Sequence, residues 1–246
     1  MKTYGLIGFP LTHSFSQKYF TEKIEREGIA NAVFHSFPLT DIEEFPALLA
    51  NHPEFNGLAV TIPYKEKVLK YITHQSEEVK QIGAANCIKI RGDELTVYNT
   101  DIIGFERSFI KHLKAHHKKA LVLGTGGASK AIQFVLKKLE IEFLVVSRNK
   151  NEAENCIQYN MLTQSIIYEY KIIINTTPLG MSPAEGICPD IPYQFITANH
   201  YLYDLIYAPA KTLFLQKGEE QGAIIENGFE MLIIQAEENW RIWNED

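Results

Sequence analysis

Short apolar runs alternate along the chain with longer segments in which apolar residues recur every three or four positions. Runs of the first kind are typical of buried strands, and segments of the second kind are typical of helices that cover a sheet. The first hundred residues are therefore expected to form a mostly parallel sheet with helices between its strands. The predicted strands are 4–8, 33–39 and 57–62, each followed by a predicted helix, at 16–28, 41–50 and 63–72.

The stretch GLAVTIPYKEKV, residues 57–68, ends one of these strands with a proline and two lysines. Pro63 suits the first position of a helix, where its missing N–H costs nothing. Lys65 is then expected in the first helical turn, although the helix dipole disfavours a cation there. A nearby carboxylate would give that placement a reason, whereas Lys67 is expected to be a solvated surface charge.

A second alternating series begins near residue 118, after a predicted hairpin (86–90 with 95–98, turning at Gly92-Asp93) and an amphipathic segment that could link two domains. The last segment carries an apolar helical stripe that includes Phe229 and Trp243. The whole pattern predicts an α/β protein with two sheets. Strands of the second series are expected at 120–123, 143–146, 172–175, 202–206 and 223–225.

The length and composition fit two domains with a ligand cleft between them, since 246 residues exceed a typical single domain. A net charge of −6 argues against nucleic acid as the main partner. The N-terminal apolar run is too short for a signal peptide or membrane span, so we expect a cytoplasmic protein without a membrane partner. Cys87, Cys156 and Cys188 lack the spacing of a disulfide framework or a zinc site, and no metal is expected.

A glycine-rich turn, LVLGTGGASKAI, follows a predicted strand and precedes a predicted helix. Its order, with Gly124, Gly126 and Gly127, departs from the strict dinucleotide-binding pattern. The physics is retained, because glycines allow close backbone approach and a helix N-terminus offers free N–H groups to a pyrophosphate. The competing interpretation is a purely structural strand–helix connection.

The next strand end reads VVSRNKNEAE, without the acid that usually binds the ribose 2′-hydroxyl of NAD. Ser147, Arg148, Asn149 and Lys150 offer a hydroxyl, an amide and cations, which favour the 2′-phosphate of NADP(H). A solvated basic turn is an equally good explanation of these four residues from composition alone.

Polar residues also follow several predicted strands of the first half, where a packed core would not need them. The carboxyl ends of strands form the ligand crevice of open α/β sheets, so these groups would suit a small polyhydroxylated anion. The competing interpretation is that Ser16 and Thr61 cap helices and that Asp101 caps the helix beginning at Ile102. The residues are Ser14, Ser16, Thr61, Lys65, Asn86, Asn99 and Asp101.

Eight stretches, in order and at matching spacing, resemble the shikimate dehydrogenase family over essentially the whole chain. They are GFPLTHSFS, VTIPYK, GAANC, NTDIIGF, GTGGASKA, NTTPLGM, YDLIYAPAKT and NGFEMLIIQA. The resemblance implies reversible, NADPH-dependent reduction of 3-dehydroshikimate to shikimate, on the way to chorismate and the aromatic amino acids. The implied partners are these small molecules alone, and the implied state is a monomer or homodimer.

The resemblance also implies the domains and the site. Residues 1–103 with 228–246 would form an open, mostly parallel substrate domain, and residues 104–227 a Rossmann-like NADP-binding domain. Lys65 would be the catalytic lysine and Asp101 its partner. Substrate contacts would come from Ser14, Ser16, Thr61, Asn86, Tyr207 and Gln235, and cofactor contacts from Gly124, Thr125, Gly126, Gly127, Ala128, Ser147, Arg148, Asn149, Lys150, Thr176, Leu205 and Gly228.

Several positions depart from the family pattern, among them Ala59 where an asparagine is usual and Glu152 where a second arginine is usual. Two alternatives to the implied function follow. One is a quinate/shikimate dehydrogenase that uses NAD, against which the basic turn argues. The other is a non-catalytic metabolite- or dinucleotide-binding regulator, against which the retained Lys65 and Asp101 argue.

Overall fold

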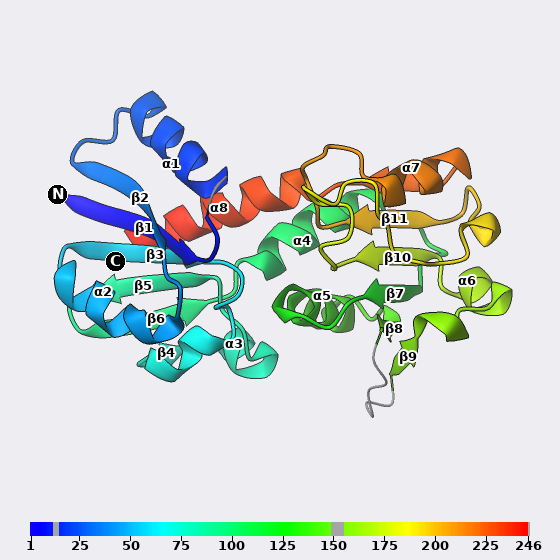
Figure 1. Ribbon diagram of the computed structural model, residues 1–246, viewed down its shortest axis with the longest axis horizontal. Helices are drawn as coiled ribbons and strands as arrows, with labels where there is room; N and C mark the ends of the chain where they lie inside the picture. The colour runs from blue at the N-terminus through cyan, green and yellow to red at the C-terminus, as the bar shows by residue number, and fades with distance from the viewer. Residues whose placement is uncertain (12–14, 149–154, 246) are drawn as a thin grey trace. The chain divides into compact units, whose positions relative to one another are not determined.

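The structure is a computed structural model that describes residues 1–11, 15–148 and 155–245. The chain divides into two compact units, each built around its own sheet (Figure 1). The first unit comprises residues 1–100 and 236–246, and the second comprises residues 101–235. The division falls within the last helix, α8 (Phe229–Asn244), so this helix belongs partly to each unit.

The sheet of the first unit has the strand order β2-β1-β3-β5-β6-β4. β1 pairs in parallel with β2 and β3, whereas β5 runs antiparallel to both β3 and β6. The β5–β6 pair is the predicted hairpin, and Gly92 takes its turn at a positive φ that glycine adopts readily. The strands are β1 (Lys2–Gly8), β2 (Ala32–Pro38), β3 (Phe55–Val60), β4 (His74–Gln75), β5 (Cys87–Arg91) and β6 (Glu94–Tyr98).

Each face of this sheet is covered by helices. Trp243 of α8 is fully buried against one face, where its ring stacks on Tyr4 at 5.3 Å and its Nε1 donates to the carbonyl of Ile88 at 3.0 Å. Phe20 of α1 completes this cluster, while Phe45 belongs to the cluster on the opposite face. The helical elements are α1 (Phe15–Arg26), η1 (Ile42–Glu44), α2 (Phe45–Asn51), η2 (Lys67–Tyr71) and α3 (Glu77–Ile82).

The sheet of the second unit is parallel throughout, with the order β12-β11-β10-β7-β8-β9. Its central strands are almost completely apolar and buried, as expected when helices cover both faces. The predicted strands of the second series are therefore present. They are β7 (Lys119–Leu123), β8 (Glu142–Ser147), β9 (Cys156–Gln158), β10 (Ile172–Asn175), β11 (Tyr201–Asp204) and β12 (Ile224–Glu226).

Helices cover both faces of this second sheet as well (Figure 1). Phe105 of α4 meets Tyr203 of β11 edge-on at 5.1 Å, and α5 packs beside α4 on β7 and β8. Ile167 of α6 and Phe214 of α7 belong to a separate core cluster with Leu202. The helical elements are α4 (Asp101–Phe109), η3 (Ile110–His112), α5 (Gly127–Lys138), η4 (Tyr159–Met161), α6 (Gln164–Glu169), η5 (Tyr193–Phe195) and α7 (Leu213–Glu220).

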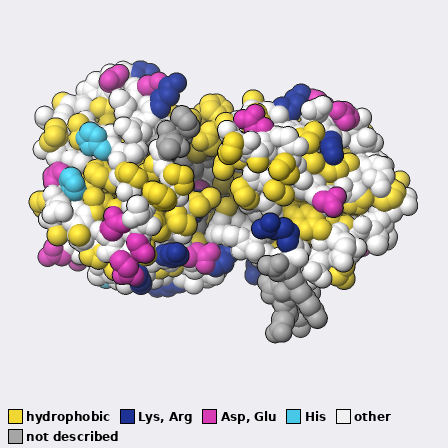
Figure 2. All heavy atoms as spheres, in the orientation of Figure 1, with side chains coloured by type: hydrophobic (Ala, Val, Ile, Leu, Met, Phe, Trp, Pro, Cys, Tyr) yellow, Lys and Arg dark blue, Asp and Glu magenta, His cyan; other side chains and the backbone are white. Residues whose placement is uncertain are grey.

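Acidic and basic side chains are intermingled on the face shown in Figure 2. Many form ion pairs within a unit, such as Lys138 with Glu106 at 2.7 Å and Lys211 with Glu219 at 2.7 Å. Within the described part of the chain, no helix is long and apolar enough to cross a membrane. The same residues contain no group of three or more His, Cys, Asp or Glu that could hold a metal ion.

Candidate active site

Lys65 follows β3 but lies in a turn, not in a helix. Its carbonyl accepts a hydrogen bond from the amide of Ala85 at 2.8 Å. An α-helix over 63–72 would direct that carbonyl to the amide of Leu69, which bonds instead to Glu66 at 3.3 Å. The prediction of this helix, with Lys65 in its first turn, is therefore wrong, and helical structure begins only with η2.

The side chains around this turn differ in exposure. Lys65 and Thr61 are half-buried, whereas Lys67 is exposed, as expected of a surface charge. The amide of Thr61 continues the sheet by donating to the carbonyl of Ile7 at 2.9 Å. The bond from Ala85 ties the turn to the segment that leads into β5, so Lys65 is held between two strand connections of the first unit.

Asn86 lies buried in that same segment and anchors the end of β6. Its Oδ1 accepts from the amide of Thr100 at 2.7 Å, and the Thr100 hydroxyl lies 2.7 Å from Oδ1 of Asn239 on α8. Asn99 donates to the carbonyl of Ala84 at 2.9 Å, while its buried Oδ1 has no hydrogen-bond partner among the described residues. The first unit therefore gathers Asn86, Asn99 and Thr100 at one strand end.

Of the two predicted serines, Ser16 lies half-buried in the first turn of α1, and Ser14 lies outside the described residues. Asp101 is the first residue of α4 and is buried. Gln235, also buried, lies on α8 and donates to the carbonyl of Leu232 at 3.0 Å.

Asp101 and Gln235 come from neighbouring helices of the second unit, because α4 and α8 approach closely at Gly104. A Cβ placed on Gly104 would lie 2.6 Å from the carbonyl oxygen of Met231 and 3.2 Å from Cβ of Gln235. Gly104 is three residues after Asp101, so both occupy the same face of α4. The structure thus brings these two predicted site residues to one helix pair.

The glycine-rich turn has the conformation that a phosphate cradle needs. Gly124 has a φ of 113°, and a Cβ there would lie 2.7 Å from Oγ1 of Thr176. Thr125 and Gly126 continue the turn, and α5 starts at Gly127 with Ala128 in its first turn. That turn has no acidic residue, and a Cβ on Gly126 would meet only open space. Backbone N–H groups and room for a pyrophosphate are therefore both present, and these residues fit a dinucleotide.

At the end of β8 the structure describes Ser147, half-buried, and Arg148, exposed. Asn149 and Lys150, also predicted to contact the cofactor, lie outside the described residues. Gln158 donates to the carbonyl of Arg148 at 3.3 Å. Burial raises the pKa of Tyr159 to about 12, and the charge of Arg148 opposes that rise. The described part of this strand end thus carries a cation and no acid, which suits a 2′-phosphate.

Of the predicted residues that follow β10, β11 and β12, Thr176 contacts the glycine turn, and Leu205 and Gly228 contact each other. Thr176 donates through its hydroxyl to the carbonyl of Leu123 at 2.7 Å, and the amide of Leu205 donates to the carbonyl of Asn175 at 3.0 Å. A Cβ on Gly228 would lie 2.1 Å from the carbonyl oxygen of Leu205, so only glycine fits there. Tyr207 lies two residues after Leu205, and burial raises its pKa.

A buried carboxylate that the sequence analysis did not single out lies among these loops. Asp204, the last residue of β11, is fully buried and accepts from Oγ1 of Thr212 at 2.6 Å. It also accepts from Nδ2 of Asn175 and from the amide of Ile206, both at 3.0 Å. Burial raises its pKa to about 6, while these three donors oppose the rise. The signal in the sequence was an acid inside the otherwise apolar predicted strand 202–206.

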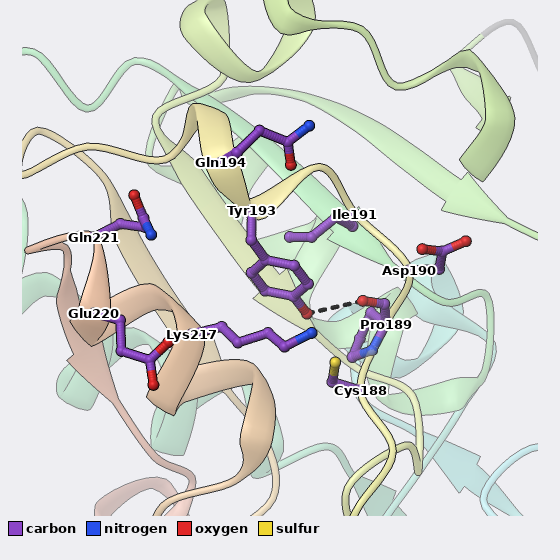
Figure 3. Close-up of a pocket in the computed structure, with 9 residues that line it drawn as sticks. All are labelled: Cys188, Pro189, Asp190, Ile191, Tyr193, Gln194, Lys217, Glu220 and Gln221. Carbon is purple, nitrogen blue, oxygen red and sulfur yellow. Dashed lines mark hydrogen bonds between the residues drawn. The ribbon is translucent and has the colours of Figure 1, made fainter.

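One surface pocket of about 460 Å³ in the second unit is formed by a different set of residues, between the segment 188–194 and α7. Lys217 extends across the ring of Tyr193, with its Nζ 4.8 Å from the ring centre, and Tyr193 donates to the carbonyl of Pro189 at 2.8 Å (Figure 3). None of its lining residues is among those predicted from the motifs. This pocket is therefore separate from the strand-end site.

A family model and similar curated proteins identify the family of this chain. The family model described as shikimate dehydrogenase substrate binding domain matches residues 6–88. Shikimate dehydrogenase (NADP(+)) of Caldicellulosiruptor saccharolyticus is 36% identical, with 99% of this chain and 92% of that protein aligned.

Solved structures agree with the sequence comparison. Shikimate dehydrogenase from Aquifex aeolicus has a TM-score of 0.88 at 31% identity, covering 99% of this chain and 92% of that one. Shikimate 5-dehydrogenase from Thermus thermophilus, in complex with NADP(H) and shikimate, has a TM-score of 0.88 at 26% identity, covering 99% and 94%. The likeness thus extends over both units.

Proposed function

Because the chain belongs to the shikimate dehydrogenase family, we propose that it catalyses the reversible reduction of 3-dehydroshikimate to shikimate with NADPH, in the pathway to chorismate and the aromatic amino acids. The observation that carries this proposal is the 36% identity over 99% of the chain to an NADP(+)-dependent shikimate dehydrogenase. The polar strand ends and the glycine turn described above support it independently.

Lys65 and Asp101 are proposed as the catalytic pair. The bound nicotinamide supplies the hydride that the ketone carbon accepts. The carbonyl oxygen must gain a proton at the same time, and a positioned acid is needed for that transfer. An ammonium such as that of Lys65 can donate this proton, and the carboxylate of Asp101 can orient it and stabilise its charge.

The substrate is proposed to bind through Ser14, Ser16, Thr61, Asn86, Tyr207 and Gln235. Hydroxyl and amide groups of this kind form hydrogen bonds with the hydroxyls and the carboxylate of shikimate. Support comes from the positions of the described members: Thr61 follows β3, Asn86 precedes β5 and Tyr207 follows β11, while Ser16 lies on α1 and Gln235 on α8. Ala59 lies in β3, and its side chain adds no amide group to this set.

NADP is proposed to bind at the turn of Gly124–Ala128, with Thr176, Leu205 and Gly228 beside it and Ser147, Arg148, Asn149 and Lys150 around the 2′-phosphate. The open N-terminus of α5 supports the pyrophosphate position, since its first turn is free of acidic side chains. The exposed Arg148 supports the preference for NADP over NAD.

The finer assignments belong to the same proposal. Residues 1–103 with 228–246 form the substrate domain, and residues 104–227 form the cofactor domain. The ligands are small molecules only, the protein acts in the cytoplasm, and it is a monomer or homodimer. A quinate/shikimate dehydrogenase that uses NAD and a non-catalytic regulator on the same fold are the alternatives to be tested.

One experiment separates these candidates. The purified protein is mixed with shikimate or with quinate, each with NADP or with NAD, and the absorbance of the reduced nicotinamide is followed. We expect reduction of NADP with shikimate. Faster reduction of NAD with quinate would favour the first alternative, and no reduction in any of the four mixtures would favour the regulator.

A further inference from the structure

We propose that Asp204 is a positioning residue for the cofactor, whose carboxylate holds together the two loops that follow β10 and β11. This inference rests on the proposed function, because those loops carry Thr176, Leu205 and Tyr207. Asp204 itself is fully buried and is not expected to touch the cofactor or the substrate.

The first loop is tied to Asp204 through Asn175. The amide Nδ2 of Asn175 donates to Oδ1 of Asp204 at 3.0 Å and to the carbonyl of Leu179 at 3.3 Å. Its Oδ1 accepts from the amide of Thr177 at 3.0 Å and from the Thr177 hydroxyl at 2.7 Å. Both bonding groups of the Asn175 side chain therefore fix the segment that begins with Thr176.

That segment is in contact with the glycine turn. The amide and hydroxyl of Thr176 both donate to the carbonyl of Leu123, at 2.9 and 2.7 Å. Thr176 and Thr177 are also the side chains that a Cβ on Gly124 would approach most closely. A shift of Asn175 would therefore be transmitted to the proposed pyrophosphate site.

The second loop is tied to Asp204 at both of its ends. The amide of Ile206 donates to Oδ1 of Asp204 at 3.0 Å, and the carbonyl of Ile206 accepts from the amide of Gly228 at 3.1 Å. At the far end, Thr212 donates to Oδ2 at 2.6 Å and caps α7 by accepting from the amide of Leu215. The residues on either side of Ile206, Leu205 and Tyr207, are those proposed to contact the ligands.

A buried carboxylate suits this position because three donors converge on it from two loops. An apolar side chain would leave those donors buried without partners. Burial of the charge nevertheless opposes ionisation, and it raises the pKa of Asp204 to about 6. The core cluster that contains Leu202 of β11 is apolar, so its packing gives no reason for a carboxylate here.

The test compares the dissociation constant for NADPH, measured by titration of its nicotinamide fluorescence, in four variants. Asp204→Ala removes all three acceptor bonds and Thr212→Val removes one. Asp204→Asn keeps an oxygen toward Asn175 and Ile206, and its amide can donate to the Thr212 hydroxyl. Thr163→Val is the matched control, because Thr163 caps α6 by accepting from the amide of Ile166 at 3.4 Å, as Thr212 does for Leu215 at 3.4 Å.

We expect the dissociation constant to rise about tenfold or more in Asp204→Ala and about fivefold in Thr212→Val, because binding must then order the loops. Asp204→Asn should stay within about threefold of wild type, and Thr163→Val should be unchanged. A purely structural role predicts lower unfolding temperatures for both capping variants with unchanged NADPH affinity, and that result would overturn the proposal. If Asp204→Ala fails to fold, the NADPH dissociation constants of Thr212→Val and Thr163→Val decide whether the proposal holds.

Failure of the proposed function is detected separately. Wild-type protein that binds NADPH but does not oxidise shikimate would contradict the function, while the affinities of the variants would still decide the role of Asp204. Wild-type protein that binds no NADPH would overturn both.

Discussion

Single side chains set the chemistry of this protein, and Lys65 is the first to test. Replacing it with alanine removes the proposed proton donor but leaves the turn backbone, which is bonded to Ala85, in place. We expect Lys65→Ala to lower kcat by about 10²–10⁴-fold while the KM for shikimate changes by less than about threefold. Steady-state kinetics measures both constants. Lys67→Ala, in the same stretch but exposed, is the control, and near-normal turnover of Lys65→Ala would contradict the assignment.

Asp204 gives a prediction about stability and pH. Its pKa rises from an ordinary value of 3.8 to about 6 on folding, so the folded protein holds the proton more tightly than the unfolded chain. Stability from this group is therefore present at low pH and is lost as the pH rises from about 4 through about 6. The difference corresponds to about 3 kcal/mol.

The measurement is the urea unfolding free energy of wild type and Asp204→Asn between about pH 4 and pH 7. Asparagine does not titrate, so wild type should gain stability relative to the variant as the pH falls. Parallel pH profiles of the two proteins would show that Asp204 keeps an ordinary pKa.

The sequence predicts the structure at a single position only where that structure depends on neighbouring residues in the sequence. The cradle of Gly124 follows from the residues beside it and was predicted, whereas the burial of Asp204 depends on Asn175, 29 residues away. The same holds for the Lys65 turn, whose carbonyl bonds to the amide of Ala85, far beyond the reach of a local pattern. A pattern of neighbouring residues cannot show hydrogen-bond partners that are this far away in the sequence.

Helices and strands were predictable where a regular apolar period continues over several residues. The parallel strands β7, β8, β10 and β11 all have buried apolar runs, and all were predicted. In contrast, β4 and β9 have two and three residues, and their existence depends on pairing with β6 and β8. The predicted apolar stripe of α8 also began too early, because Phe229, the first residue of the helix, is 47% exposed.

Two glycines of the strand–turn–helix element at the cofactor site, Gly124 and Gly126, are expected to have different roles. Alanine at Gly124 would need a positive φ and would clash with Thr176, so Gly124→Ala should lower stability by about 1–3 kcal/mol. Alanine at Gly126 meets only open space in the protein, at a φ of −75° that alanine tolerates. Its methyl group would instead occupy the room proposed for the pyrophosphate.

We therefore expect Gly126→Ala to keep the unfolding temperature within a few degrees of wild type while the NADPH dissociation constant rises about tenfold or more. Differential scanning fluorimetry and fluorescence titration measure the two quantities. Gly186→Ala, also in open space, serves as the control. Unchanged NADPH affinity in Gly126→Ala would place the pyrophosphate elsewhere.

The chain as a whole is organised so that its last residues complete the unit that its first residues begin. Trp243 is fully buried among Tyr4, Phe20 and Phe34, and a Cβ on Gly57 would lie 2.2 Å from its ring. Trp243→Ala should therefore destabilise the first unit by about 3–5 kcal/mol.

Tryptophan fluorescence can follow this loss, because the remaining Trp240 also belongs to the first unit. We expect a lower unfolding midpoint by this signal and a near-normal NADPH affinity, since the proposed cofactor residues lie in 101–235. An unfolding midpoint equal to that of wild type would contradict the role of Trp243 in the core.

The return of α8 to the first unit also determines the order in which the protein can be completed as it leaves the ribosome. The first hundred residues emerge without the last segment, 236–246, that belongs to their unit. All of residues 101–235 follow before that segment is made, so the second unit can finish folding while the first still exposes apolar surface. The connectivity therefore allows the second unit to fold before the first, against the usual vectorial order in which the N-terminal domain folds first. Until residues 236–246 have been made, the apolar sheet face that Trp243 covers stays exposed.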